Sequence, residues 1–199
     1  MNILIFGDSI AWGASDIESG GWVERLKVHF FQNEEDIDVY NLGVSGEKSG
    51  DVLKRFESEA IVRDPDMIIF AVGINDSCLS EKGVRIVETA AFRENIVALT
   101  EQARKFTKNI IFVGLIRVNE SQTCPIPWKP EKYYTNKSIE QYDDLLQSLC
   151  REERLLYVNM RDIVGHQDLD DGLHPNAFGH KKMFERVLED VLPLLEPPV

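Results

Sequence analysis

The chain has few cysteines and few basic residues, and each shortage excludes a class of protein. Three cysteines occur among its 199 residues, at Cys78, Cys124 and Cys150, and none is part of a CxxC pair. An odd number at these spacings predicts neither a disulfide framework nor a zinc site, and it suits a reducing compartment. The 22 basic residues are outnumbered by 34 acidic ones, which gives a net charge of −12. Because this charge repels phosphate backbones, nucleic acid is not an expected partner.

Long apolar runs are also missing. No segment approaches the ~18 consecutive apolar residues of a membrane helix. The first residues, MNILIF, lack the charged region and cleavage site of a secretory signal. We therefore expect a cytoplasmic protein without stable membrane insertion, and its length suits a single domain over residues 1–199.

Apolar segments rich in Ile, Val and Phe alternate with longer amphipathic ones, which is typical of a parallel sheet covered by helices. The predicted strands are Ile3–Phe6, Asp38–Leu42, Met67–Val72, Ile110–Leu115 and Leu156–Asn159. The predicted helices are Gly21–Gln32, Ser49–Arg63, Val84–Phe106, Asn136–Arg151 and Asn176–Leu194. This alternation predicts an α/β fold, a three-layer α/β/α sandwich whose five-stranded parallel sheet has the flavodoxin-like order 2-1-3-4-5.

Residues suited to acyl transfer follow four of these strands. Ser9 follows the first strand, Gly43 the second and Asn75 the third, whereas Asp171 and His174 follow the fifth. In open parallel sheets, sites form outside the carboxyl ends of the strands, where the strand order reverses. The predicted order therefore places Ser9 between Gly43 and Asn75.

The chemistry of a serine nucleophile gives each of these residues a role. A serine hydroxyl needs a base, normally a histidine whose tautomer is fixed by a carboxylate. Asp171 and His174, three residues apart in a glycine-containing turn, meet this need. The oxyanion of the intermediate needs hydrogen-bond donors, which we expect to be the backbone N–H groups of Ser9 and Gly43 and the amide of Asn75.

The blocks FGDSI, NLGVSG, GINDS and DGLHPN, in this order over residues 6–176, resemble the GDSL family of esterases and lipases, also called SGNH hydrolases. The resemblance implies a 2-1-3-4-5 sheet and a catalytic triad of Ser9, Asp171 and His174. It also implies an oxyanion hole of Ser9, Gly43 and Asn75. Ile10 stands where the family name has leucine, a volume-conserving change. The expected activity is a serine esterase that cleaves carboxylic esters of small or acylated substrates through an acyl-enzyme, with no metal and no cofactor.

The irregular stretch 117–134 follows the fourth strand on the side of these blocks. Long loops of this kind often form binding walls. We expect Trp128, Tyr133 or Tyr134 to border the substrate, although the same rings suit a purely structural role in pinning the loop.

Several alternatives to the small-ester esterase stay open. A lysophospholipase or thioesterase would act on longer acyl chains, and a binding module of the same fold would have lost the reaction. A phosphate or nucleotide binder is disfavoured because the turn after the first strand lacks glycine-rich spacing. A metal site at Asp168, Asp170, Asp171 and His174 is disfavoured because no second histidine joins the cluster. Asp8 and Asp76 suit capping or bracing of their loops.

Overall fold

The computed structural model describes residues 1–33 and 36–195, and a parallel sheet runs through its centre. The sheet has five strands in the order β2-β1-β3-β5-β7, and every neighbouring pair is parallel. The strands are β1 (Asn2–Gly7), β2 (Asp38–Gly43), β3 (Met67–Ala71), β5 (Ile110–Val113) and β7 (Leu156–Val158). Counted among the sheet strands alone, this is the order 2-1-3-4-5, so the prediction is confirmed.

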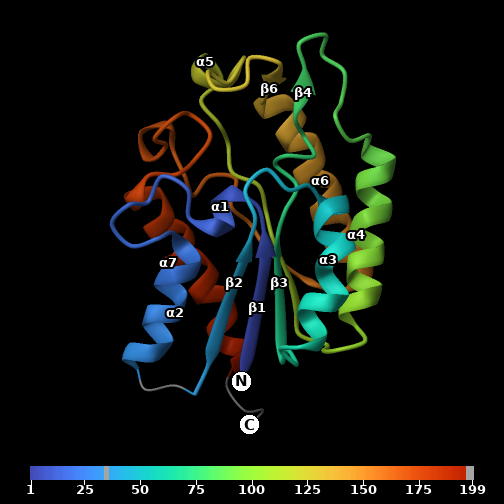
Figure 1. The fold of residues 1–199 in the computed structure, drawn as a ribbon, viewed down its shortest axis with the longest axis vertical. Helices are drawn as coiled ribbons and strands as arrows, with labels where there is room; N and C mark the ends of the chain where they lie inside the picture. The colour runs from blue at the N-terminus through green and yellow to red at the C-terminus, as the bar shows by residue number, and fades with distance from the viewer. Residues whose placement is uncertain (34–35, 196–199) are drawn as a thin grey trace.

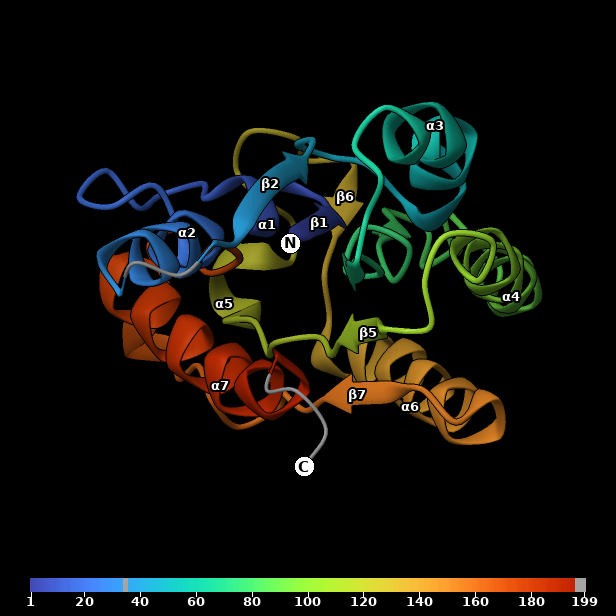
Figure 2. The same cartoon turned by 90° about the horizontal axis from the view of Figure 1, so that it is seen from below.

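Helices cover both faces of the sheet, as Figure 2 shows. On one face α2 (Trp22–Gln32) packs against α7 (Ala177–Leu195). On the other face α3 (Ser49–Ile61), α4 (Thr89–Ala103) and α6 (Asn136–Glu153) lie side by side. The four residues 3–6 of the central strand β1 are fully buried, as expected for a strand covered on both sides. The predicted three-layer sandwich is therefore confirmed.

A row of packed phenylalanine rings holds β1, the strand that leads to Ser9, in place. Phe6 of β1 lies 5.0 Å from Phe56 of α3 and 5.8 Å from Phe70 of β3, between ring centroids. Phe70 in turn stacks on Phe112 of β5 at 5.0 Å. All four rings are fully buried. Such tilted and offset pairs stabilise a core beyond the area they bury, so the carboxyl end of β1 is rigidly held.

Several short elements were not predicted from the sequence. They are α1 (Ser9–Trp12), β4 (Leu79–Ser80), α5 (Glu120–Thr123), β6 (Lys132–Tyr133) and a 3₁₀ turn at His166–Asp168. Three of them, α5, β4 and β6, lie at the top of Figure 1 beyond the carboxyl edge of the sheet. Strands β4 and β6 pair antiparallel, with Leu79 opposite Tyr133. This pairing joins the loop after β3 to the loop after β5.

The predicted helix Val84–Phe106 is too long at its start, since α4 begins at Thr89. The N–H of Ser80 donates to the carbonyl of Val84 at 2.8 Å, and Gly83 takes a φ of +71° in the turn between them. The chain therefore doubles back onto β4 before the helix begins. No helix in the ranges 1–33 and 36–195 is long and apolar enough to cross a membrane.

Candidate active site

Ser9 is the first residue of α1, directly after a sharp turn out of β1. Asp8 has an extended backbone, and its buried side chain accepts the N–H of Ile10 at 2.9 Å, which caps the helix. A Cβ at Gly7 would lie 2.5 Å from the Cβ of Ala11 and 2.6 Å from the carbonyl oxygen of Ala71. The turn therefore needs glycine at position 7, and it presents Ser9 half-buried at the edge of the sheet.

A continuous chain of hydrogen bonds runs from Ser9 to Asp171 through His174. The hydroxyl oxygen of Ser9 lies 2.9 Å from Nε2 of His174, and Nδ1 of His174 lies 2.7 Å from Oδ2 of Asp171. A carboxylate only accepts hydrogen bonds, so Nδ1 carries the ring proton and Nε2 is left to accept from Ser9. The nucleophile candidate and its base are 165 positions apart in the sequence, and the fold brings them into contact.

Asp171 divides its two oxygens between the imidazole and the backbone. Oδ1 accepts the N–H groups of Leu173 and His174 at 2.9 and 2.8 Å, which leaves Oδ2 for the ring. Burial opposes the charge of this carboxyl, but the hydrogen bonds from His174 and Leu173 outweigh it and hold the pKa of Asp171 below its ordinary value. The carboxylate therefore stays ionised at neutral pH and fixes the orientation of the imidazole.

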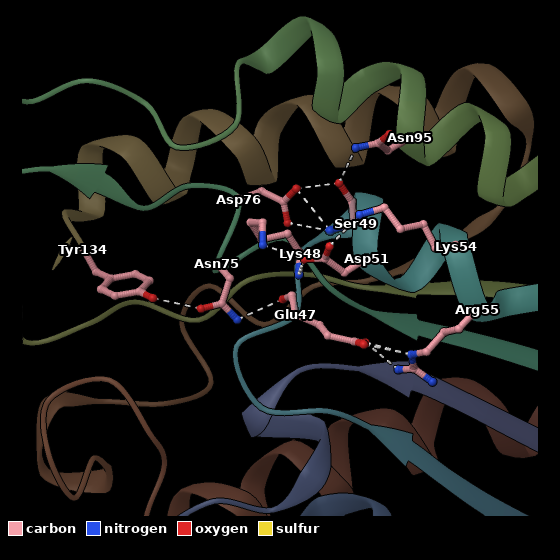
Figure 3. Close-up of polar contacts among 10 residues, drawn as sticks. All are labelled: Glu47, Lys48, Ser49, Asp51, Lys54, Arg55, Asn75, Asp76, Asn95 and Tyr134. Carbon is pink, nitrogen blue, oxygen red and sulfur yellow. Dashed lines mark hydrogen bonds and ion pairs between the residues drawn. The ribbon is translucent and has the colours of Figure 1, made fainter. Parts of the chain in front are cut away.

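The side-chain amide of Asn75 is held by hydrogen bonds at both of its ends, as Figure 3 shows. Its Oδ1 accepts the phenol O–H of Tyr134 at 2.8 Å, and its Nδ2 donates to the carbonyl of Glu47 at 3.0 Å. An amide nitrogen carries two protons, so one N–H of Asn75 is left for a ligand. Both Asn75 and Tyr134 are buried.

Asp76 fastens the loop of Asn75 to the start of α3 (Figure 3). Its carboxyl accepts both the backbone N–H and the hydroxyl of Ser49, and the amide of Asn95 donates to the same hydroxyl at 2.9 Å. Burial raises the pKa of Asp76 above its ordinary value. The expected bracing of Asn75 thus has a direct counterpart in these contacts.

A pocket of about 240 Å³ opens over these groups. Residues that line it include Ser9, Gly46, Asn75, Trp128, Tyr134 and His174. A hydroxyl, an imidazole and an amide donor therefore face one space, which is the arrangement that nucleophilic acyl transfer needs.

The sequence profile of the GDSL-like lipase/acylhydrolase family matches residues 5–182. The chain belongs to this family. It is thereby a hydrolase of the class that acts on ester bonds. The resemblance read from the four sequence blocks is confirmed.

Individual relatives cover most of the chain. Esterase TesA of Pseudomonas aeruginosa is 24% identical over 197 residues, which are 97% of this chain and 89% of the relative. An acetylxylan esterase of Geobacillus stearothermophilus is 22% identical over 170 residues, 78% of this chain and 72% of the relative. The crystal structure of a lipase/acylhydrolase from Enterococcus faecalis matches with a TM-score of 0.79 at 22% identity, over 100% of this chain and 98% of that one. At this identity the structural similarity shows a shared fold and nothing more.

The structure does not place Gly43 in the pocket, contrary to its expected role in the oxyanion hole. Its N–H donates to Oδ1 of Asn41 at 3.0 Å. A Cβ at this position would overlap the backbone nitrogen of Trp12 and lie 2.9 Å from the carbonyl oxygen of Asp8. Glycine is therefore needed at position 43 so that the end of β2 packs beneath α1, and its N–H is not available to a substrate.

Gly46, the second glycine of NLGVSG, lines the pocket instead. It adopts a φ of +85°, and no heavy atom lies within 4 Å of the place where its Cβ would stand. In the described part of the chain its N–H has no hydrogen-bond acceptor. The block NLGVSG contains both glycines. Proximity to the predicted strand end favours Gly43, whereas Gly46 lies in the turn that follows.

The three aromatic residues expected at the substrate differ in position. The ring of Trp128 stacks near His174, with centroids 5.9 Å apart, planes inclined by 26° and 48% of the residue exposed. Tyr134 lines the pocket but is buried and bonded to Asn75. Tyr133 is half-buried in β6 and is not among the lining residues that the structure describes.

Asp168, one of the residues weighed as metal ligands, has other partners. Oδ2 of Asp168 accepts the ammonium of Lys182 at 2.7 Å and the N–H of Gly165 at 2.8 Å. Over residues 1–33 and 36–195, no group of three or more His, Cys, Asp or Glu side chains is arranged to hold a metal ion.

His180 fastens helix α7 to the loop after α1. It is fully buried, its Nδ1 accepts the N–H of Trp22 at 3.3 Å, and its Nε2 donates to the carbonyl of Ala14 at 3.0 Å. Burial lowers the pKa of His180, so the ring is neutral and serves both contacts. The contacts link the segment that carries His174 to the segment that carries Ser9.

Proposed function

We propose that the chain is a serine esterase that hydrolyses carboxylic esters of small or acylated substrates through a Ser9–His174–Asp171 triad. The observation that carries this proposal is the unbroken hydrogen-bond chain from the Ser9 hydroxyl through the imidazole to the carboxylate, at 2.9 and 2.7 Å. It ends at a pocket that a substrate can enter.

The reaction proceeds in two steps. Nε2 of His174 takes the proton of Ser9 as its oxygen attacks the ester carbonyl, and the resulting imidazolium is stabilised by Asp171. His174 then protonates the leaving alcohol, which leaves an acyl group on Ser9. A water molecule, deprotonated by the same imidazole, attacks this acyl group; the Ser9–acyl bond breaks, the acid is released, and the imidazolium returns the proton to the Ser9 oxygen.

The oxyanion of each tetrahedral intermediate is stabilised by three donors, the N–H of Ser9, the N–H of Gly46 and the free amide N–H of Asn75. Ser9 is the first residue of α1, and the first N–H groups of a helix have no acceptor within it. Gly46 takes the role first expected of Gly43, since the N–H of Gly43 is already bonded to Asn41. Loss of one such donor costs about 10²–10³ in rate.

The size of the pocket supports short acyl groups or acetylated sugars as substrates. Relatives named esterase and acetylxylan esterase agree with this class. A longer acyl chain, as in a lysophospholipase or thioesterase, is the competing substrate class. It would have to extend beyond the half-exposed ring of Trp128.

Labelling with a fluorophosphonate tests the nucleophile. The wild type and Ser58→Ala, which removes an exposed hydroxyl of α3, should be labelled, whereas Ser9→Ala should not. A panel of 4-nitrophenyl esters of increasing chain length, together with acetylated xylose oligomers, then defines the acyl group. Labelling that survives in Ser9→Ala, or ester hydrolysis at the wild-type rate in that variant, would overturn the proposal.

A further inference from the structure

Two lysines, Lys129 and Lys132, line the pocket that contains Ser9 and His174. Both belong to the segment between β5 and α6, in which Lys132 begins β6. Among the described residues that line this pocket, no side chain is acidic. The only ionised groups on its walls are therefore cationic, although the chain as a whole carries a net charge of −12.

Backbone hydrogen bonds hold the turn that contains these lysines. The N–H of Lys132 donates to the carbonyl of Lys129 at 2.9 Å, and the N–H of Ile126 donates to the carbonyl of Lys132 at 3.0 Å. Lys132 also lies opposite Ser80 in the β4–β6 pair. Pro127 and Pro130 restrict the backbone of the same turn. The two side chains thus start from one preformed turn at the pocket wall.

The charges of the two lysines are not neutralised by the protein. In the ranges that the structure describes, neither makes an ion pair, whereas Lys48 and Lys182 each contact an aspartate within 2.7 Å. Glu131, which lies between them in sequence, is exposed and does not line the pocket. The nearest catalytic carboxylate, Asp171, is occupied by His174 and by two backbone N–H groups.

Two lysines that line the pocket, one exposed and one half-buried, attract anions toward it. In a partly enclosed site, opposite charges attract more strongly than in bulk water, because the effective dielectric constant is lower. The excess of acidic residues elsewhere repels the same anions from the remaining surface. The charge distribution therefore favours a substrate that carries its negative charge close to the ester.

We propose that the preferred substrates of this site are esters that bear a carboxylate or phosphate group near the scissile bond, bound by Lys129 and Lys132. This inference rests on the proposed esterase function. The anion takes no part in bond making, so the reaction remains attack by Ser9, release of the alcohol and hydrolysis of the acyl group. The anion acts by binding and by orienting the ester.

Matched pairs of esters test the inference. On the acyl side, the mono-4-nitrophenyl ester of glutaric acid is compared with the corresponding glutaramic ester, in which an amide replaces the carboxylate. On the alcohol side, 4-acetoxybenzoate is compared with 4-acetoxybenzamide. For each pair the readout is the ratio of kcat/KM for the anionic ester to that for its neutral partner.

The ratio is measured in wild type, Lys129→Gln, Lys132→Gln and Lys108→Gln. Lys108 is an exposed lysine directly before β5, at the opposite edge of the sheet, so its variant makes the same change in net charge away from the pocket. Comparison between variants cancels the intrinsic reactivity of each ester. An ion pair at a partly exposed site is worth up to about a fivefold change in binding.

We expect the ratio to fall by about threefold to fivefold in each pocket variant for at least one of the two ester pairs, and to stay at the wild-type value in Lys108→Gln. The pair that responds identifies whether the anion lies on the acyl or the alcohol side. The wild-type preference should also weaken between 0.02 and 0.5 M salt, since ions screen the attraction.

A ratio that is equal in wild type and both pocket variants for both pairs would overturn the inference. In that case the neutral esters are still hydrolysed in a Ser9-dependent manner, so the proposed function stands. If wild type hydrolyses none of the four esters and is not labelled by the fluorophosphonate, the proposed function itself fails.

Discussion

The phenol of Tyr134 donates to Oδ1 of Asn75 across 2.8 Å, and both side chains are almost inaccessible to solvent. This contact joins the loop after β3 to the end of β6, 59 positions further along the chain. By occupying Oδ1, it decides which end of the amide is left to face the pocket. Tyr134 thus lines the pocket and also positions the amide of Asn75.

Replacement Tyr134→Phe removes this hydrogen bond and keeps the ring. We expect kcat for 4-nitrophenyl acetate to fall by about tenfold, a part of the ~10²–10³ that loss of a whole oxyanion donor costs, with little change in KM. Tyr133→Phe is the control from the neighbouring position. In a double-mutant cycle, Tyr134→Phe should lower kcat no further once Asn75 is alanine. Additive losses in the cycle would contradict the positioning role.

The two glycines of NLGVSG should respond in opposite ways to alanine. Gly43→Ala places a methyl group against the backbone of Trp12 and Asp8, so the free energy of unfolding should fall by several kcal/mol. Gly46→Ala meets no neighbouring atom and costs about 1–2 kcal/mol through its positive φ, but kcat should fall because the strained turn shifts its N–H. Urea unfolding and steady-state kinetics separate the two effects. A stable, inactive Gly43→Ala with a fully active Gly46→Ala would restore the role of Gly43.

Asp8 makes stability depend on pH. Burial raises the pKa of Asp8 to about 7, aided by the nearby charge of Asp76 and opposed by Ile10 N–H and His174. The unfolded chain releases this proton near the ordinary pKa of 3.8, while the folded chain holds it until about pH 7. The unfolded state therefore binds fewer protons between these values, and stability falls as pH rises from about 4 to 7.

Asp8→Asn removes this titration while keeping an oxygen to cap Ile10. As pH rises from 4.5 to 7.5, the free energy of unfolding of the variant should increase by a few kcal/mol relative to that of wild type, because each pKa unit corresponds to ~1.4 kcal/mol. Denaturant titrations at both pH values measure the difference, with the exposed Asp38→Asn as control. An identical shift in the two variants would rule out a special role for the buried carboxyl.

Trp128→Ala should change substrate preference more than stability. The residue is 48% exposed, so its loss removes about half of the buried area that a core tryptophan would lose, and its ring lies beside the imidazole of His174. We expect KM for aryl esters to rise several-fold, with acetylated sugars less affected and Trp128→Phe close to wild type. A variant that differs from wild type only in melting temperature would indicate that the ring merely pins the loop.

The sequence was sufficient for the sheet order and for the group of residues at its carboxyl edge. Strands such as β1 are buried on both faces, so they appear in the sequence as short apolar runs, and Ser9 and Asn75 follow two and four residues after the ends of β1 and β3. Asp171 and His174 are close in sequence, and a local turn alone brings them into contact. These features depend on short-range patterns and on the few allowed connections of a parallel sheet.

The remaining features depend on long-range packing. The choice between Gly43 and Gly46 follows from the packing of α1 against the end of β2, which no local pattern records. The bond between Tyr134 and Asn75 requires the β4–β6 pair, whose two-residue strands are too short to give a periodic signal. The predicted start of α4 is also too early, because residues 79–86 fold back on themselves before the helix begins.

The contacts of His180 make the attachment of the C-terminal segment important for activity. The proposed nucleophile Ser9 follows the first strand of the chain, whereas its proposed base, His174, lies 165 residues later, just before the last helix. The neutral imidazole at position 180 clamps that helix onto the loop behind Ser9. Local detachment of this final segment would abolish hydrolysis while the five strands of the sheet stay assembled, so loss of activity on heating or in denaturant should precede the loss of β-sheet signal.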